Sequence, residues 1–156
     1  MRQAPWGLVA SVLALPLACT TTDRTPTDQQ NVYETLLAQA RPALERFYKG
    51  DPSGYVELFA DELTYFDPRS GGRLDGIIAL KDYFAPIEGK INVPRYEVLN
   101  PKLQLHGDIG VFTYNLNEYA SDGAVSVRWN STEVYRRIGE EWRIIHAHWS
   151  TIENTE

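Results

Sequence analysis

Residues 142–150, Trp-Arg-Ile-Ile-His-Ala-His-Trp-Ser, decide the fold of this 156-residue chain. In a β-strand successive side chains point to opposite faces, so this stretch divides into two sets. One set is Trp142, Ile144, His146, His148 and Ser150, and the other is Arg143, Ile145, Ala147 and Trp149. Both sets are bulky and largely apolar, which is typical of a central strand covered on both faces. We therefore predict a buried strand over residues 141–152.

The rest of the chain divides into a helical first half and a second half of long strands. Apolar residues first recur at three- and four-residue steps, and beyond residue 94 the period changes to two. Helices are expected over 27–49, 51–60 and 77–84. Strands are expected over 63–67, 95–106 with a bulge at Pro101, 111–120, 125–137 and 141–152.

This order of elements predicts an α+β domain. Three N-terminal helices are expected to pack on one face of a strongly curved, mainly antiparallel sheet. Such a sheet leaves a cavity between its concave face and the helices, where a small ligand can bind.

The N-terminal region resembles an export signal. Arg2 precedes an apolar segment too short to span a bilayer, and Cys19, the single cysteine, follows directly. We predict a lipoprotein-type signal peptide at residues 1–18, lipidation of Cys19 and a flexible tether over 19–30. Pro16 stands where such signals normally carry leucine, so plain secretion and an uncleaved leader remain alternatives. The expected location is the periplasmic side of a bacterial cell envelope, with the lipid as the only membrane anchor.

Composition limits the classes of partner. The chain carries 15 Lys and Arg against 21 Asp and Glu, a formal net charge of −6, and its basic residues form no run. Proteins that bind nucleic acids need a basic surface against the phosphate backbone, so we expect no nucleic-acid partner.

Five segments in this order resemble the nuclear-transport-factor-2-like superfamily, in particular SnoaL-like proteins and the association domain of calcium/calmodulin-dependent protein kinase II. They are Phe66-Asp67-Pro68 with its Gly-rich loop, Lys81-Asp82-Tyr83-Phe84, Leu99-Asn100-Pro101, the strand 111–119 and the strand 142–150. The resemblance covers a domain over 31–153 and implies a cone-shaped fold that usually pairs into homodimers. It does not imply kinase activity, because the chain has no kinase catalytic motif.

The resemblance also implies where a pocket lies and how it differs here. In the association domain the pocket resembles an anion site lined by three arginines and a histidine. The matching positions in this chain are Leu116, Glu133, Trp149 and Leu80. None of the four is basic and a carboxylate repels anions, so we expect a small neutral or cationic ligand.

Strand alternation adds Tyr114 and Glu118 to the candidate ligand-binding residues. They share one strand face with Leu116, and the resemblance points this face, with those of Glu133 and Trp149, into the cavity. A buried glutamate needs a partner or a proton. Glu133 therefore either binds the ligand or pairs with a nearby Tyr or Arg, and we favour the pairing.

Asp67 is the candidate catalytic residue. Ketosteroid isomerases, another branch of the superfamily, carry their catalytic aspartate in a similar Asp-Pro loop, and an aspartate facing an apolar cavity can transfer a proton. In these isomerases a tyrosine from the first helix acts together with the aspartate. That tyrosine corresponds to a position near Ala43 here, so the resemblance supplies only half of the proton-transfer apparatus. Asp67 can equally serve to order the turn before Pro68.

His146 and His148 have the spacing of two metal ligands on one strand. The resemblance turns both away from the pocket, so they are expected to pack with Trp142 at a sheet or dimer surface. His106 is the only other histidine in the sequence, and we expect no metal site. The sequence contains no nucleophile elbow, and we expect no cofactor.

Three hypotheses for function follow. The first is an exported domain that binds a small molecule. The second is an enzyme of the isomerase, cyclase or hydratase kind that uses Asp67 as acid and base. The third is an oligomerisation module without kinase activity.

Overall fold

The structure is a computed structural model and describes residues 26–153. Its helices are α1 (Pro26–Tyr48), α2 (Ser53–Val56), α3 (Gly76–Phe84) and the 3-10 helix η1 (Ala85–Ile87). Its strands are β1 (Phe59–Phe66), β2 (Leu74–Asp75), β3 (Arg95–His106), β4 (Ile109–Tyr119), β5 (Val125–Ile138) and β6 (Glu141–Thr151). None of the helices in this range has the length and apolarity that a membrane crossing requires.

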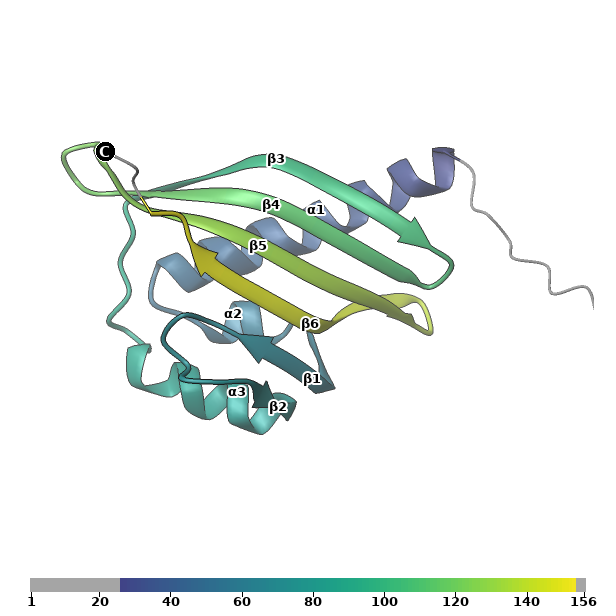
Figure 1. The fold of residues 1–156 in the computed structure, drawn as a ribbon, viewed down its shortest axis with the longest axis horizontal. Helices are drawn as coiled ribbons and strands as arrows, with labels where there is room; N and C mark the ends of the chain where they lie inside the picture. The colour runs from purple at the N-terminus through teal and green to yellow at the C-terminus, as the bar shows by residue number, and fades with distance from the viewer. Residues whose placement is uncertain (1–25, 154–156) are drawn as a thin grey trace, which may run out of the picture.

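The strands form one sheet in the order β2-β1-β6-β5-β4-β3, which places β6 inside the sheet as predicted. β1 runs parallel to β6, and the other neighbouring strands pair antiparallel. The long helix α1 crosses behind β3, β4 and β5, whereas α3 lies beside β1 and β2 (Figure 1). This arrangement confirms the predicted α+β class and its curved, mainly antiparallel sheet.

The strict alternation expected along β6 is wrong at one residue. Val134 pairs with His146 and the next residue, Tyr135, pairs with Ile144, so Ile145 is an extra residue in β6. Such a bulge shifts the side-chain parity on its two sides. Trp142 and Ile144 are therefore buried on the same side as Trp149. The expectation that Trp142 packs with His146 and His148 is wrong.

Several expected bounds also change. The helix α1 begins at Pro26, so residues 26–30, which we assigned to the tether, are helical. The Gln29 side-chain amide donates to the carbonyl oxygen of Leu103 (3.0 Å), which attaches this end of the helix to β3. The signal peptide, Cys19 and the rest of the tether lie outside the described residues.

The expected helix over 51–60 is shorter, because the chain enters the sheet early. The N–H of Ile144 donates to the carbonyl oxygen of Leu58 (2.8 Å), and β1 begins at the next residue. The bulge expected at Pro101 is confirmed, since the β3–β4 register shifts between Leu99 and Lys102.

The segment after η1 is tied to the end of α1. The N–H of Gly89 donates a hydrogen bond to the carbonyl oxygen of Gly50 (2.8 Å). The N–H of Val93 donates one to the carbonyl oxygen of Tyr48 (3.0 Å). Gly50 has φ +92°, and an added Cβ would lie 3.2 Å from backbone atoms of Gly89 and Ile91. Glycine is needed here because it tolerates both the positive φ and the close approach. The segment 88–94 thereby closes one side of a cavity.

Candidate functional site

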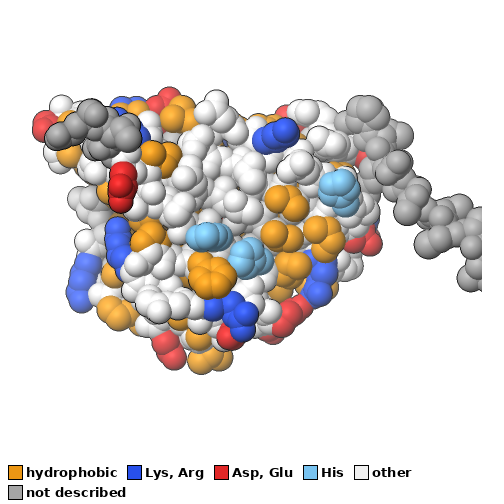
Figure 2. All heavy atoms as spheres, in the orientation of Figure 1, with side chains coloured by type: hydrophobic (Ala, Val, Ile, Leu, Met, Phe, Trp, Pro, Cys, Tyr) orange, Lys and Arg blue, Asp and Glu red, His pale blue; other side chains and the backbone are white. Residues whose placement is uncertain are grey.

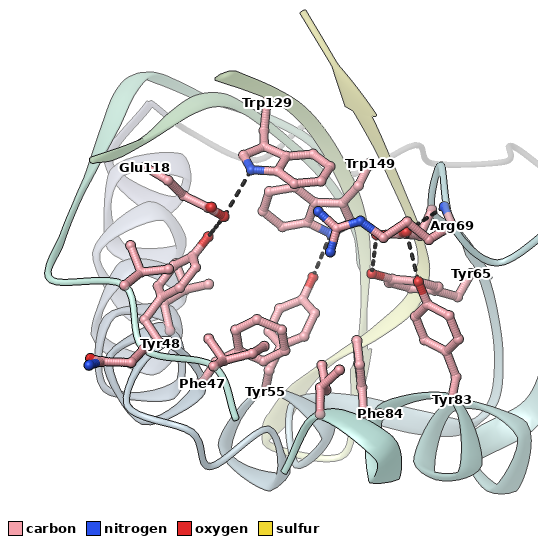
Figure 3. Close-up of a pocket in the computed structure, with 16 residues that line it drawn as sticks. Phe47, Tyr48, Tyr55, Tyr65, Arg69, Tyr83, Phe84, Glu118, Trp129 and Trp149 are labelled. Atoms are coloured by element: carbon pink, nitrogen blue, oxygen red, sulfur yellow. Dashed lines mark hydrogen bonds between the residues drawn. The ribbon is translucent and has the colours of Figure 1, made fainter. Parts of the chain in front are cut away.

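A cavity of about 460 Å³ lies between the sheet and the helices (Figure 3). Its lining is dominated by eight aromatic side chains: Phe47, Tyr48, Tyr55, Tyr65, Tyr83, Phe84, Trp129 and Trp149. Its polar lining residues are Asp67, Arg69, Asn92 and Glu118. An apolar cavity of this size with a few convergent polar groups is typical of small-molecule sites.

Edge-to-face contacts hold the aromatic lining in place. The rings of Trp129 and Trp149 are 6.0 Å apart at an interplanar angle of 86°. The ring of Tyr55 meets that of Trp149 at 6.3 Å and 76°. Such T-shaped pairs match the positive edge of one ring to the negative face of the next. The two indoles therefore present fixed surfaces to the cavity.

Asp67 lies at the cavity wall directly after β1. Its Oδ1 accepts hydrogen bonds from the Tyr83 hydroxyl (2.7 Å) and from the backbone N–H of Arg69 (2.8 Å). The hydroxyl of Tyr65 lies 3.5 Å from Oδ2. Asp67 therefore both orders the turn and faces the cavity, and two tyrosines stand beside it although the position near Ala43 carries none.

Both tyrosines beside Asp67 are held in their protonated form. Burial raises the pKa of Tyr83, and its hydrogen bond to Asp67 acts in the same direction. Burial also raises the pKa of Tyr65 well above its ordinary value, and the charge of Asp67 adds to this shift. At neutral pH both hydroxyls are therefore donors.

Glu118 lies at another part of the wall. Its Oε1 accepts hydrogen bonds from Trp129 Nε1 (2.9 Å) and from the Tyr48 hydroxyl (3.1 Å) (Figure 3). These bonds orient the carboxylate and leave its second oxygen without a hydrogen bond among the described residues. The sequence predicted Glu118 and Trp149 as ligand-binding residues, and both line the cavity.

Glu133 is buried under the cavity, with 1% of its surface exposed. Its Oε1 accepts hydrogen bonds from the hydroxyls of Tyr55 (2.8 Å) and Tyr114 (2.9 Å), and its Oε2 accepts one from Tyr135 (2.9 Å). The Tyr55 oxygen in turn accepts a hydrogen bond from Trp149 Nε1 (3.0 Å). Glu133 thus pairs with tyrosines, as we favoured, and reaches the cavity only through Tyr55.

The other predicted ligand-binding residues lie behind the cavity wall. Leu80 and Leu116 are fully buried. Tyr114 borders a separate hollow of about 100 Å³ between α1 and the β3–β4 strands. The four positions matched to the basic pocket therefore contribute only Trp149 to the cavity lining.

Sequence reasoning missed Trp129 and Arg69 as lining residues. A signal for Trp129 was present, because it has the same strand parity as Ser131 and Glu133, which are both buried. Arg69 carried no comparable signal, since it lies in a loop where no period predicts direction. Arg69 is also a basic side chain at a cavity in which we expected no basic residue.

His146 and His148 face away from the cavity, on the exposed side of the sheet. The His146 Nδ1 lies 2.8 Å from the Thr64 hydroxyl, and the two imidazole rings contact the ring of Phe66. Burial lowers the pKa of His146, and His148 adds a smaller effect in the same direction. Within residues 26–153 no three His, Cys, Asp or Glu side chains are grouped so that they could hold a metal ion.

Comparison with known proteins identifies the family. The family model described as the calcium/calmodulin dependent protein kinase II association domain matches residues 30–153. The chain belongs to this association-domain family. No curated protein matches the chain.

Solved structures agree with this family and with the wider fold. A candidate ketosteroid isomerase from Parabacteroides distasonis is 30% identical to this association-domain chain, with a TM-score of 0.68 over 86% of this chain and 93% of the other. The association domain of the C. elegans kinase is 20% identical, with a TM-score of 0.65 over 80% and 98%. An NTF2-like protein from Pseudomonas putida is 20% identical, with a TM-score of 0.69 over 85% and 92%. The last two show the shared fold.

The buried carboxyl group makes stability depend on pH. Burial raises the pKa of Glu133 above its ordinary value of 4.5, although the three tyrosine hydrogen bonds oppose this shift. A raised native pKa means that this group favours the folded state most below pH 4.5 and that the contribution is lost as pH rises through the native pKa. We expect the stability advantage of the wild type over Glu133→Gln to be larger at acidic than at neutral pH.

Urea unfolding of the wild type and Glu133→Gln at acidic and at neutral pH measures this difference in the free energy of unfolding. Exposed carboxylates and other titrating groups are common to both proteins, so their effects cancel. Glu140→Gln, whose side chain is 93% exposed, controls for the loss of one charge. An advantage that grows toward neutral pH would contradict the assignment.

Proposed function

We propose that this association-domain protein binds a small neutral or cationic molecule in its aromatic cavity. The observation that carries the proposal is the combination of eight aromatic side chains with the carboxylates of Asp67 and Glu118 in a space of about 460 Å³. Within the described residues neither carboxylate takes part in an ion pair. Aromatic faces attract apolar and cationic groups, and the second carboxylate oxygen of Glu118, which has no hydrogen bond among the described residues, can accept one from a ligand.

Filling the cavity tests this proposal. Ile91 lines the cavity from the segment closing its side, so Ile91→Trp is expected to occupy the ligand space. A thermal-shift screen of neutral and cationic aromatic compounds is expected to find stabilising ligands. A ligand at 100 times its Kd adds about 2.7 kcal/mol, which raises Tm by several degrees. Ile91→Trp is expected to abolish this rise.

The matched control is Ile78→Trp on α3, because Ile78 is 65% exposed and does not line the cavity. It should leave the rise in Tm unchanged. If hits stabilise the wild type and Ile91→Trp equally, they bind elsewhere and the proposal is wrong.

A second candidate function is proton transfer by Asp67. It is favoured by the Tyr83 hydroxyl 2.7 Å from Oδ1, since a carboxylate and a phenol beside an apolar space can together take and return a proton. The 30% identity to a candidate ketosteroid isomerase also supports it.

Isomerisation of a β,γ-unsaturated ketosteroid to its conjugated isomer, followed by ultraviolet absorbance, measures this activity. Asp67→Asn is expected to lower the rate by about 10²- to 10⁴-fold, the usual contribution of a general acid or base. Asp82→Asn, an exposed position on α3, is the control. A rate that Asp67→Asn leaves unchanged would exclude this role.

We also propose that copies of the chain assemble, at least as a homodimer, through the exposed face of β1 and β6. The association-domain family supports assembly. Phe66 is 37% exposed on this face beside the rings of His146 (6.0 Å) and His148 (5.6 Å). Figure 2 shows two histidines next to hydrophobic side chains on this side of the molecule.

Sedimentation velocity tests the assembly. The wild type is expected to sediment as a dimer or a larger species, and Phe66→Glu to shift it toward the monomer, because a charge would be buried in the contact. Ile78→Glu on α3 is the exposed control. A wild type that remains monomeric at high concentration would rule out this role.

We also propose that the protein is exported and that a lipid is attached covalently to Cys19. This rests on the sequence of residues 1–19 alone, which lie outside the described part of the chain. Mass spectrometry of the membrane fraction tests it, and an unmodified thiol at Cys19 would contradict it.

A further inference from the structure

We propose that Trp129 and Glu118 form a subsite for a cationic group of the ligand, and that Arg69 of the same chain occupies it when the ligand is absent. The inference rests on the proposed small-molecule function, because it assigns a ligand class to the same cavity. Its basis is the position of the Arg69 guanidinium group, which forms no ion pair within residues 26–153.

Arg69 lines the cavity, although the residue is itself exposed. Its guanidinium carbon lies 5.6 Å from the centre of the Trp129 ring, within the range of a cation–π contact. Figure 3 shows the side chain extending toward Trp129 and Trp149. Among the described residues Arg69 forms no ion pair. Its neighbour Arg73 instead pairs with Asp75 outside the cavity (2.8 Å).

The loop itself directs Arg69 inward. The Asp67 carboxylate accepts a hydrogen bond from the backbone N–H of Arg69 (2.8 Å), and the Ser70 hydroxyl lies within hydrogen-bond distance of the carbonyl oxygens of Asp67 (2.9 Å) and Gly72 (2.6 Å). These contacts fix the turn around residue 69. The side chain is then held near Trp129 by attraction to the ring, not by a carboxylate.

Trp129 is a better cation receptor than an isolated indole. Its Nε1–H donates to Glu118 Oε1 (2.9 Å), and a hydrogen bond to an anion increases the negative charge on the ring face. The Tyr48 hydroxyl holds the same carboxylate oxygen (3.1 Å). The second oxygen of Glu118 stays available to an ammonium or guanidinium group, so this corner of the cavity attracts a cation by two means.

The same geometry sets the effect of Arg69 on binding. A ligand cation must displace the guanidinium group, so the apparent affinity equals the affinity for the free subsite multiplied by the fraction of molecules in which the subsite is free. Removing Arg69 should therefore tighten the binding of a cation. If Arg69 instead anchors an anionic ligand, its removal should weaken binding, which is the opposite sign.

Three probes of one shape and different charge test the subsite: choline, 3,3-dimethyl-1-butanol and 3,3-dimethylbutanoate. Titrations of the full chain, followed by the NMR signal of the Trp129 indole N–H, measure their dissociation constants. We expect the order of affinity to be choline, then the alcohol, then the carboxylate. Arg69→Ala is expected to tighten choline binding about three- to sixfold, as expected from a contact of ordinary cation–π strength.

Arg73→Ala removes the same charge from the same loop and is expected to leave choline binding unchanged. Glu118→Gln, which keeps an oxygen for Trp129 and Tyr48, is expected to weaken choline binding and not that of the alcohol.

The inference is overturned if Arg69→Ala weakens choline binding or leaves it unchanged, or if the carboxylate binds best to the wild type. If the alcohol binds as well as choline, the cavity still takes small molecules and only the cation subsite is wrong. If none of the three probes binds, the cation subsite is wrong, whereas the proposed function is decided separately by the thermal-shift screen with Ile91→Trp.

Discussion

The hydrogen bonds to the carboxylate of Glu133 are the constraint on which the rest of the structure depends. A buried carboxylate is costly unless donors surround it, and three tyrosine hydroxyls do so here. The donors come from α2, β4 and β5, and Tyr55 extends the network to Trp149 on β6. One buried carboxyl group therefore joins a short helix to three strands and fixes two aromatic side chains of the cavity wall.

The cavity above this network has two chemically different polar regions. Asp67 lies among tyrosine hydroxyls at the end of β1, and the proposed proton transfer is placed there. Glu118 lies with Trp129, where the indole and the carboxylate together attract positive charge. Arg69 is the cation present within this space. The position matched to an arginine in the association-domain pocket carries Glu133, which serves the core.

The proposed binding and assembly surfaces lie on opposite sides of the sheet. Trp149 faces the cavity, while His148 on the same strand contacts Phe66 on the exposed side. This separation is a direct consequence of strand alternation. A ligand in the cavity and a second copy on the outer face would therefore not compete for the same residues, and one domain can carry both functions.

The sequence by itself determined the order of the strands along the chain and the central position of β6, because these follow from a period of two in the apolar side chains. The family resemblance, not this period, placed Glu133 and Trp149 on the inner side of the sheet. Only the tertiary structure decided that Ile145 is a bulge and that Trp142 is buried, since an extra residue leaves no mark in the apolar pattern. It also brought Tyr83 to Asp67 and Arg69 to Trp129. These contacts join a loop to a helix and to a strand that come later in the chain, and no local period encodes them.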